Sequence, residues 1–122
     1  RDFTYIDDLI ESIKRLIHFP PNQTTKKDIS VSMVDSQSMV APYRIVNIGT
    51  SETVELIKFI DLIEKTLGIK AKKRLLPMQS GDVPNTWSDT SLLRQITDYS
   101  PSTSLKKGVN EFIIWYKKYY NL

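Results

Sequence analysis

A loop in the second half of the chain carries an amide and a carboxylate three residues apart, in the sequence Pro77-Met78-Gln79-Ser80-Gly81-Asp82-Val83-Pro84. The two prolines limit the conformations open to this backbone. A carboxylate can accept hydrogen bonds from both hydroxyls of a ribose, as it does in other nucleotide sites. The loop therefore indicates nucleotide binding, while a turn with a capping aspartate explains the same residues equally well.

A second candidate binding segment runs from Arg1 to Asp8. An arginine at a strand end can grip a phosphate because its planar guanidinium offers parallel N–H donors. Asp7 and Asp8 invite an acid–base interpretation, but adjacent residues on a helix point about 100° apart and rarely share a site. We therefore expect these two carboxylates to cap a helix.

No set of residues in the sequence could catalyse a reaction alone. There is no cysteine and a single histidine, His18, which excludes disulfides, thiolate chemistry and histidine metal clusters. A nucleophile paired with histidine and a glycine-rich phosphate loop are also missing. Gly49-Thr50-Ser51 could hold an anion at a helix start, although an ordinary strand-to-helix turn explains it. We predict no catalytic, cofactor-binding or metal-binding residue in this chain.

The elements that must position these segments begin with a helix. Thr4 and Asp7 have the spacing of a capping box, and Pro20-Pro21 stops the helix. The polar stretch 20–42 then predicts a long mobile loop. The helix is predicted because its apolar residues recur at helical spacing, at Ile6, Leu9, Ile10, Ile13, Leu16 and Ile17.

Two short strands flank the clearest helix. Alternating β-forming residues predict strands over 43–48 and 71–77. Between them, Ser51 is the expected cap of a helix that Gly68 ends in the left-handed conformation.

Two further helices complete the expected elements. Asp89 is expected to cap a short helix, and Thr103 or Ser104 to start the last one. Aromatic residues at helical spacing more often form a core than a platform for a sugar, so we expect those of the last helix to be buried. Its apolar positions are Val109, Phe112, Ile113, Tyr116, Tyr119 and Tyr120.

The composition is that of one soluble globular domain. The 122 residues are 40% hydrophobic and 25% charged, with a net charge of +3. The basic residues are scattered, which favours a solvated surface over a nucleic-acid partner. No apolar run approaches the ~20 residues that cross a bilayer, and no signal peptide is visible. We expect a cytoplasmic protein with no membrane partner, and its start at arginine suggests a piece of a longer polypeptide.

Segments along nearly the whole chain resemble the extended short-chain dehydrogenase/reductase family. Residues 1–8 resemble its R-D-[FY]-x-[YH]-[IV]-x-D motif, and 43–49 resemble a later strand that typically ends in N-I-G. Residues 76–89 are similar to the L-P-M-Q-x-G-D-V-x-x-T-x-x-D stretch of UDP-glucuronate 4-epimerases. Residues 101–103 and 112–116 match the closing P-x-T…F-x-x-W-Y pattern.

The resemblance implies a fold and three substrate-binding residues. The fold is α/β, the C-terminal substrate-binding portion of a Rossmann-type enzyme over 1–122, with helices packed against a few short strands. Arg1 matches the arginine that contacts the UDP diphosphate, and Asp82 matches the aspartate that holds the ribose. Gln79 stands where many galactose-type epimerases have a phosphate-binding arginine; glutamine is usual in the glucuronate subgroup, which leaves its own contact open.

The resemblance also implies what lies outside the chain. Family members carry a G-x-x-G-x-x-G loop for NAD and a catalytic Y-x-x-x-K pair upstream of the arginine motif, and this sequence contains neither. The chain is therefore expected to bind no cofactor and to be inactive alone. Its expected partners are a UDP-sugar and its own Rossmann half, and a second copy in a homo-oligomer is allowed.

For the intact enzyme the resemblance implies interconversion of UDP-glucuronate and UDP-galacturonate. NAD would take a hydride from C4, the 4-keto intermediate would rotate, and the hydride would return to the other face. A UDP-glucuronate decarboxylase or another UDP-hexose epimerase is the alternative within the family. A non-catalytic binding or scaffold module is the alternative from another class.

Overall fold

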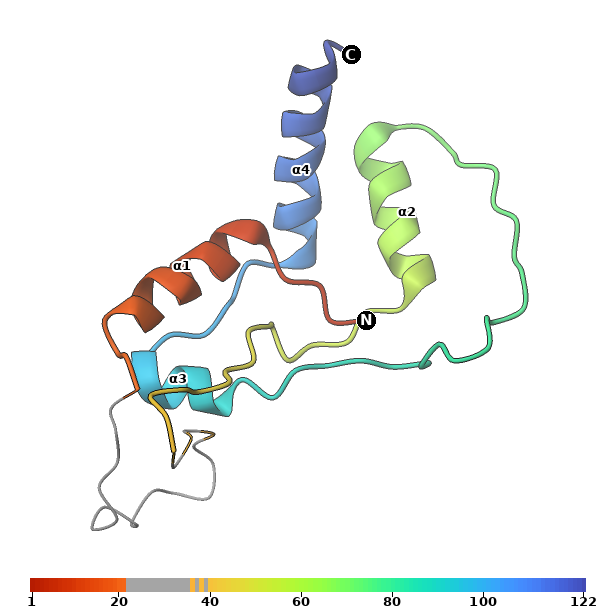
Figure 1. The fold of residues 1–122 in the computed structure, drawn as a ribbon. Coiled ribbons are helices and arrows are strands. Elements are labelled where there is room, and N and C mark those ends of the chain that lie inside the picture. The colour runs from red at the N-terminus through yellow and green to blue at the C-terminus, as the bar shows by residue number, and fades with distance from the viewer. Residues whose placement is uncertain (22–35, 37, 39) are drawn as a thin grey trace.

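The computed structural model describes residues 1–21, 36, 38 and 40–122 (Figure 1). In this part of the chain the regular elements are four helices: α1 (Ile6–Ile17), α2 (Leu56–Leu67), α3 (Ser91–Thr97) and α4 (Leu105–Tyr120). α1 packs against α3 and α2 against α4, and the described segments 40–55, 68–90 and 98–104 between these helices are irregular. Most of the loop predicted for 20–42 lies outside the described residues, and that prediction stays open.

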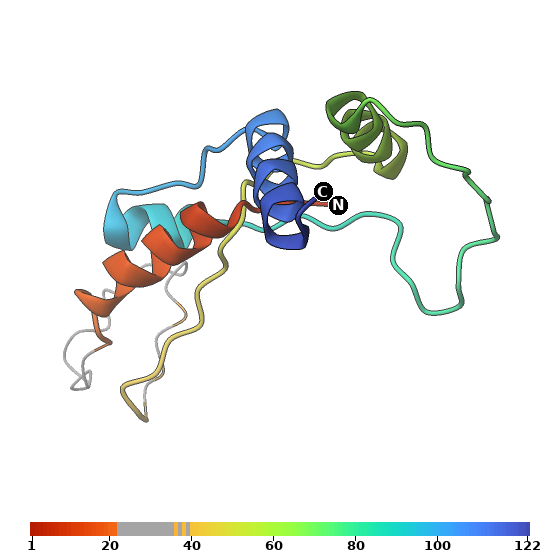
Figure 2. The same ribbon diagram turned by 90° about the horizontal axis from the view of Figure 1, so that it is seen from above.

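The two segments predicted as strands form no ladder of hydrogen bonds within the described residues. A strand needs a neighbouring strand to satisfy its backbone groups, and neither 43–48 nor 71–77 has one there. Figure 2 shows both as irregular chain. One antiparallel backbone pair does form elsewhere: Arg1 N donates to the Val54 carbonyl at 2.8 Å, and Val54 N donates to the Arg1 carbonyl at 2.9 Å.

The apolar face of the first helix is only partly covered: Leu9 and Leu16 are half-buried, and its isoleucines are exposed. Asp8 and Ser12 are 8% and 0% exposed, on the side of α1 that packs against α3. The row formed by Ile6, Ile10, Ile13 and Ile17 is exposed instead. A continuous apolar row left in water is unusual in a globular protein.

The buried apolar core of the described part is small. Leu93 of α3 is fully buried and Leu92 nearly so, and α4 contributes Val109 and Ile113. The remaining long side chains of these helices are half-buried or exposed. A core this small leaves much of the fold to polar contacts between segments, which are described below.

The aromatic residues of α4 are not buried, contrary to the prediction. Phe112, Trp115 and Tyr116 are exposed, as are Tyr119 and Tyr120, with values from 40% to 65%. They contact one another along the helix: the Trp115 and Tyr119 rings lie 5.3 Å apart. Helical spacing places these rings on one face, but burial needs a neighbouring element, and the described residues supply one only for Val109 and Ile113.

Local signals at the helix ends predict some caps correctly and others wrongly. Ser104 caps α4 by accepting from Lys107 N, and Gly68 ends α2 with φ +72°, both as predicted. The prediction that Thr4 caps α1 is wrong, because α1 starts after Tyr5 without a side-chain cap. The Ser51 cap is also wrong, since α2 starts after Glu55.

Asp89 acts one residue earlier than a standard cap. The N-cap of α3 is Thr90, and Asp89 Oδ1 accepts from Ser91 N at 2.9 Å. The expected contribution of Asp89 to the start of α3 is thus present in a shifted form.

A cluster of charges closes the segment after α2 onto the helix. The buried Glu64 carboxylate accepts from Lys73 Nζ, Lys70 Nζ and Ala71 N, each at 2.9 Å. These hydrogen bonds, led by that from Lys73, lower the pKa of Glu64 to about 2. The chain after Gly68 is therefore held against α2 before it runs on to the candidate loop.

Candidate functional site

Arg1 and Asp82, 81 residues apart in the sequence, form an ion pair at the edge of an open cavity. The bond joins Arg1 Nη2 to Asp82 Oδ1. The cavity has a volume of about 770 Å³ and is lined by Arg1, by residues within 53–58 and by residues within 76–85. The two candidate binding segments of the sequence thus meet at one place.

Both side chains of this pair have polar atoms without a hydrogen-bond partner among the described residues. Arg1 Nη1 is buried and has no hydrogen-bond partner among the described residues. A buried N–H without an acceptor costs about 1–3 kcal/mol, so a shift of the guanidinium that brings this nitrogen to a phosphate oxygen would be favourable. Asp82 is half exposed, and its Oδ2 accepts from no described residue, which leaves it available to a ribose hydroxyl.

Gln79 contributes its backbone to the loop. Its carbonyl accepts from Asp82 N at 3.2 Å, across a turn in which Gly81 adopts φ +86°. Glycine suits this position because residues with a Cβ rarely adopt that conformation. The Gln79 side chain is not among those that line the cavity, so the structure brings together Arg1 and Asp82 but not the amide of Gln79.

Asp2 joins three distant segments, and sequence reasoning did not single it out. Its Oδ1 accepts from Thr50 N and Oγ1 at 3.1 and 2.7 Å, and its Oδ2 accepts from Ser51 N at 3.0 Å. Oδ2 also accepts from Ser88 N and Oγ at 3.2 and 2.9 Å. Burial opposes ionisation, but the hydrogen bonds from Thr50 and Ser88 outweigh it and lower the pKa of Asp2. We call Asp2, Thr50, Ser51 and Ser88 the Asp2 cluster.

Gly49 has no Cβ, and this allows Asp2 and Ser88 to approach its backbone closely. A Cβ on Gly49 would lie 1.8 Å from Ser88 Oγ and 2.8 Å from Asp2 Oδ2, far inside contact distance. The glycine interpreted from the sequence as an ordinary turn is therefore needed for a close approach between segments. Nothing local in the sequence pairs Gly49 with a serine 39 positions later, and only the fold reveals it.

Asp8 forms a comparable anchor at the other end of the first segment. Its carboxylate accepts from Tyr99 Oη at 3.0 Å, from Ser102 N at 3.2 Å and from Thr103 N at 2.8 Å. Burial opposes ionisation, but these bonds prevail and the pKa of Asp8 is lowered. The predicted capping role is wrong for Asp8, which holds the approach to α4 instead.

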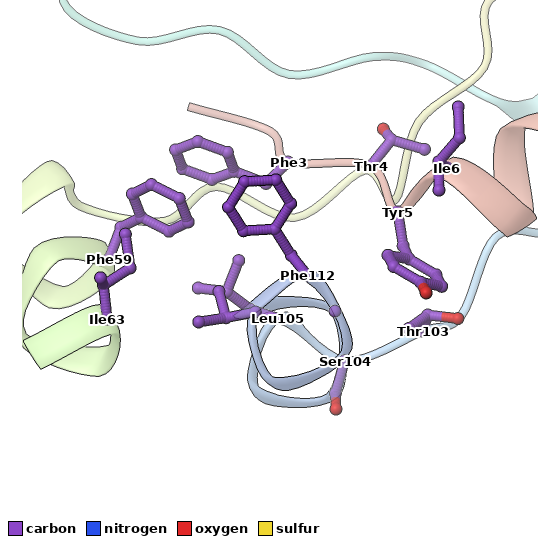
Figure 3. Close-up of a pocket in the computed structure, with 12 residues that line it drawn as sticks. Phe3, Thr4, Tyr5, Ile6, Phe59, Ile63, Thr103, Ser104, Leu105 and Phe112 are labelled. Carbon is purple, nitrogen blue, oxygen red and sulfur yellow. The ribbon is translucent and has the colours of Figure 1, made fainter. Parts of the chain in front are cut away.

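An apolar cavity of about 310 Å³ lies between the first segment, α2 and α4 (Figure 3). The Phe3 and Phe59 rings stack there, with centroids 4.2 Å apart. Gly108 lets Tyr5 approach α4, because a Cβ on it would lie 3.2 Å from Tyr5 Cδ2. This packing holds the residues that follow Arg1.

Within the part of the chain that the structure describes, neither a metal site nor a membrane-spanning helix is found. No group of histidine and carboxylate side chains is arranged to hold a metal ion. No helix there has both the length and the apolar character of a membrane span.

Comparison with known proteins shows that this chain is similar to part of proteins named UDP-glucuronate 4-epimerase. No protein-family model matches the sequence. A probable UDP-glucuronate 4-epimerase of Rhizobium meliloti (strain 1021) is 45% identical over 120 residues, covering 98% of this chain and 35% of that protein. UDP-glucuronate 4-epimerase 1 of Arabidopsis thaliana is 35% identical, covering 98% of this chain and 27% of that protein.

A solved structure of an epimerase is also similar to this chain. It is a mutant UDP-glucuronic acid 4-epimerase from Bacillus cereus in complex with UDP-4-deoxy-4-fluoro-glucuronic acid and NAD. The match has a TM-score of 0.72 and 31% identity, and covers 98% of this chain and 32% of that one. The predicted fold class is thereby confirmed, while its short strands stay a prediction.

More particularly, the chain is related over its whole length to UDP-glucuronate 4-epimerases. It spans 35% of the length of the Rhizobium relative and 27% of that of the Arabidopsis relative. The resemblance inferred from the motifs is confirmed, since these matches cover nearly the whole chain.

Proposed function

We propose that this chain is the UDP-sugar-binding part of an NAD-dependent epimerase that interconverts UDP-glucuronate and UDP-galacturonate. The observation that carries the proposal is the meeting of Arg1 and Asp82 at one cavity, each with an unused polar atom. The names of the relatives support it, as does the solved relative that holds a UDP-glucuronic acid analogue with NAD.

The proposed roles divide the nucleotide between the two side chains. Arg1 Nη1 donates to an oxygen of the diphosphate, while Nη2 keeps its bond to Asp82 Oδ1. Asp82 Oδ2 accepts from a ribose hydroxyl. Gln79, whose backbone carbonyl accepts from Asp82 N, is the third proposed substrate-binding residue. These residues bind and orient the sugar nucleotide, and none of them takes part in the chemical step.

The chemical step belongs to groups outside these 122 residues. NAD, when bound by the remainder of the enzyme, would supply reversible hydride transfer at C4 of the sugar. The 122-residue sequence has neither the glycine loop nor the Y-x-x-x-K pair that such chemistry uses in the family. The proposal therefore assigns this chain to recognition of the nucleotide.

The reaction products of the complete polypeptide distinguish the proposed activity from the alternative activities. The complete polypeptide that carries this segment should convert UDP-glucuronate to UDP-galacturonate, as followed by chromatography of the sugar nucleotides. Release of CO₂ with formation of a UDP-pentose would indicate the decarboxylase instead. Turnover of UDP-glucose but not UDP-glucuronate would indicate a hexose epimerase. Failure to bind or convert any UDP-sugar would favour the scaffold module.

The 122-residue chain alone is expected to show no turnover of UDP-glucuronate and no heat of binding with NAD. The reason is that both motifs for cofactor and catalysis are absent from its sequence. Calorimetry with NAD and a product assay measure the two quantities, with the complete polypeptide as the positive control. Tight binding of NAD by the short chain would contradict the division of labour proposed for the two parts of the enzyme.

The uncovered apolar surfaces motivate the proposed partners. The isoleucine row of α1 and the aromatic face of α4 are exposed in the chain alone. Each buried side chain of this kind is worth about 1.5–3 kcal/mol. We assign the Rossmann half of the intact enzyme to these surfaces, and a second copy when that half is missing. Sedimentation velocity should then show the short chain self-associating, and a strict monomer with these surfaces in water would exclude self-association.

The soluble composition motivates a cytoplasmic location, which cell fractionation tests.

A further inference from the structure

Each segment that lines the cavity beside Arg1 and Asp82, called here the Arg1–Asp82 cavity, is connected to Asp2 through the chain or close to one of its hydrogen bonds. Arg1 is its neighbour in the chain. The wall formed by 53–58 starts two residues after Ser51, and the wall formed by 76–85 ends three residues before Ser88. Ser51 and Ser88 both donate to the Asp2 carboxylate. One side chain thus fixes the origin of three segments that must meet around a ligand.

Further contacts make this junction rigid. Ser51 has φ +60°, a conformation uncommon for residues other than glycine, and its Oγ donates to the Ser88 carbonyl at 2.8 Å. The backbone pair between Arg1 and Val54 continues the junction toward the cavity. A strained residue persists where its surroundings hold it, and such positions often occur at ligand-binding sites.

We propose that Asp2 is a positioning residue for UDP-sugar binding: it touches no ligand, but sets the distance between the guanidinium of Arg1 and the carboxylate of Asp82. This inference depends on the proposed function. Both carboxylate oxygens of Asp2 are needed, because five donors from Thr50, Ser51 and Ser88 converge on them. In Asp2→Asn the side-chain amide would direct its own N–H groups toward some of these five donors, and those hydrogen bonds would be lost.

Asp8 provides a matched comparison. It is also a partly buried carboxylate in the first segment, and it also receives hydrogen bonds from a distant loop. Its partners Tyr99, Ser102 and Thr103 do not line the Arg1–Asp82 cavity. If carboxylates of this kind only stabilise the fold, Asp2→Asn and Asp8→Asn should behave alike.

The test compares these two variants in the complete polypeptide with NAD. Loss of several charge-assisted hydrogen bonds at this junction should displace the walls of the cavity, so Asp2→Asn should raise the Kd for UDP at least about 10-fold. Asp8→Asn should leave that Kd within about twofold at a temperature where both variants are folded. The Kd for NAD should be unchanged in both, which a general loss of folded protein would not reproduce.

A second variant keeps the test decisive if Asp2→Asn does not fold. Ser88→Ala removes one hydroxyl donor and leaves no unpaired charge, and should raise the Kd for UDP about threefold, consistent with loss of one hydrogen bond of modest net strength. A folded Asp2→Asn, or in its place Ser88→Ala, with an unchanged Kd for UDP overturns the inference. Asp82→Asn separates the two claims: if it weakens UDP binding while the Asp2 cluster variants do not, only this inference fails. If the unmodified enzyme binds no UDP, the proposed function fails as well.

Discussion

Gly49→Ala is expected to lower the free energy of unfolding by about 3 kcal/mol or more, because overpacking at a rigid contact is among the costlier substitutions. The added Cβ would lie 1.8 Å from Ser88 Oγ and 3.0 Å from Ser88 Cβ. Ser88 can turn its hydroxyl away only by giving up its bond to Asp2. Urea unfolding monitored by circular dichroism measures the change.

Two control variants isolate the cause of this loss. Gly108→Ala also adds a methyl group near a side chain, but at 3.2 Å from Tyr5 Cδ2, and should cost much less. In a Ser88→Ala background the cost of Gly49→Ala should shrink, because the closest clashing atom is gone. Equal effects of Gly49→Ala and Gly108→Ala, or an undiminished cost in the Ser88→Ala background, would show that the close approach is misplaced.

Asp82→Ala in the complete polypeptide is expected to raise the KM for UDP-glucuronate roughly 10- to 100-fold. Loss of a hydrogen bond to a charged group typically costs about 1.5–3 kcal/mol, and each ~1.4 kcal/mol is tenfold in affinity. The substitution removes the proposed acceptor for the ribose and also frees Arg1 from its ion pair. Steady-state kinetics with UDP-glucuronate measures the effect.

Asp61→Ala is the control for this change. Asp61 is similarly exposed and is also ion-paired, with Lys73 at 3.0 Å, but it lies away from the cavity. Its replacement should leave the KM within about twofold, since exposed ion pairs contribute little. An Asp82→Ala enzyme with the KM of the Asp61→Ala control would remove Asp82 from the site.

The sequence allowed accurate prediction where the signal is local. Gly68 ends α2 and Ser104 caps α4 because each acts within one turn of its own helix. The motif at 76–89 indicates Asp82 as a binding residue, and that role stays a prediction. Its meeting with Arg1 could be inferred only from the resemblance, because 81 residues separate the two.

The predictions failed where long-range contacts compete with local ones. Ser51 is a good helix cap by residue type, but its hydroxyl is committed to the Ser88 carbonyl. Asp8 suits a helix N-terminus, but the loop before α4 supplies donors to its carboxylate. Asp2 was overlooked for the same reason, since its partners lie 48 to 86 positions away.

The prediction for the aromatic residues of α4 failed for a different reason. Their spacing gives a face, as expected of a packed helix, yet a face is buried only if something lies against it. In the described part of the chain α2 covers only part of α4, and Trp115 and Tyr119 stay exposed. The pattern indicates a face, and no described element covers Trp115 or Tyr119 on it.

The most direct test of the central claim is a crystal structure of the complete polypeptide with UDP-glucuronate and NAD. The predicted result has a diphosphate oxygen within about 3 Å of Arg1 Nη1 and a ribose hydroxyl within about 3 Å of Asp82 Oδ2, the ordinary range of such hydrogen bonds. In that result the Asp2 cluster keeps its five hydrogen bonds. A UDP moiety bound elsewhere, with Arg1 and Asp82 engaged only with each other, would contradict the claim that this chain forms the nucleotide-sugar site.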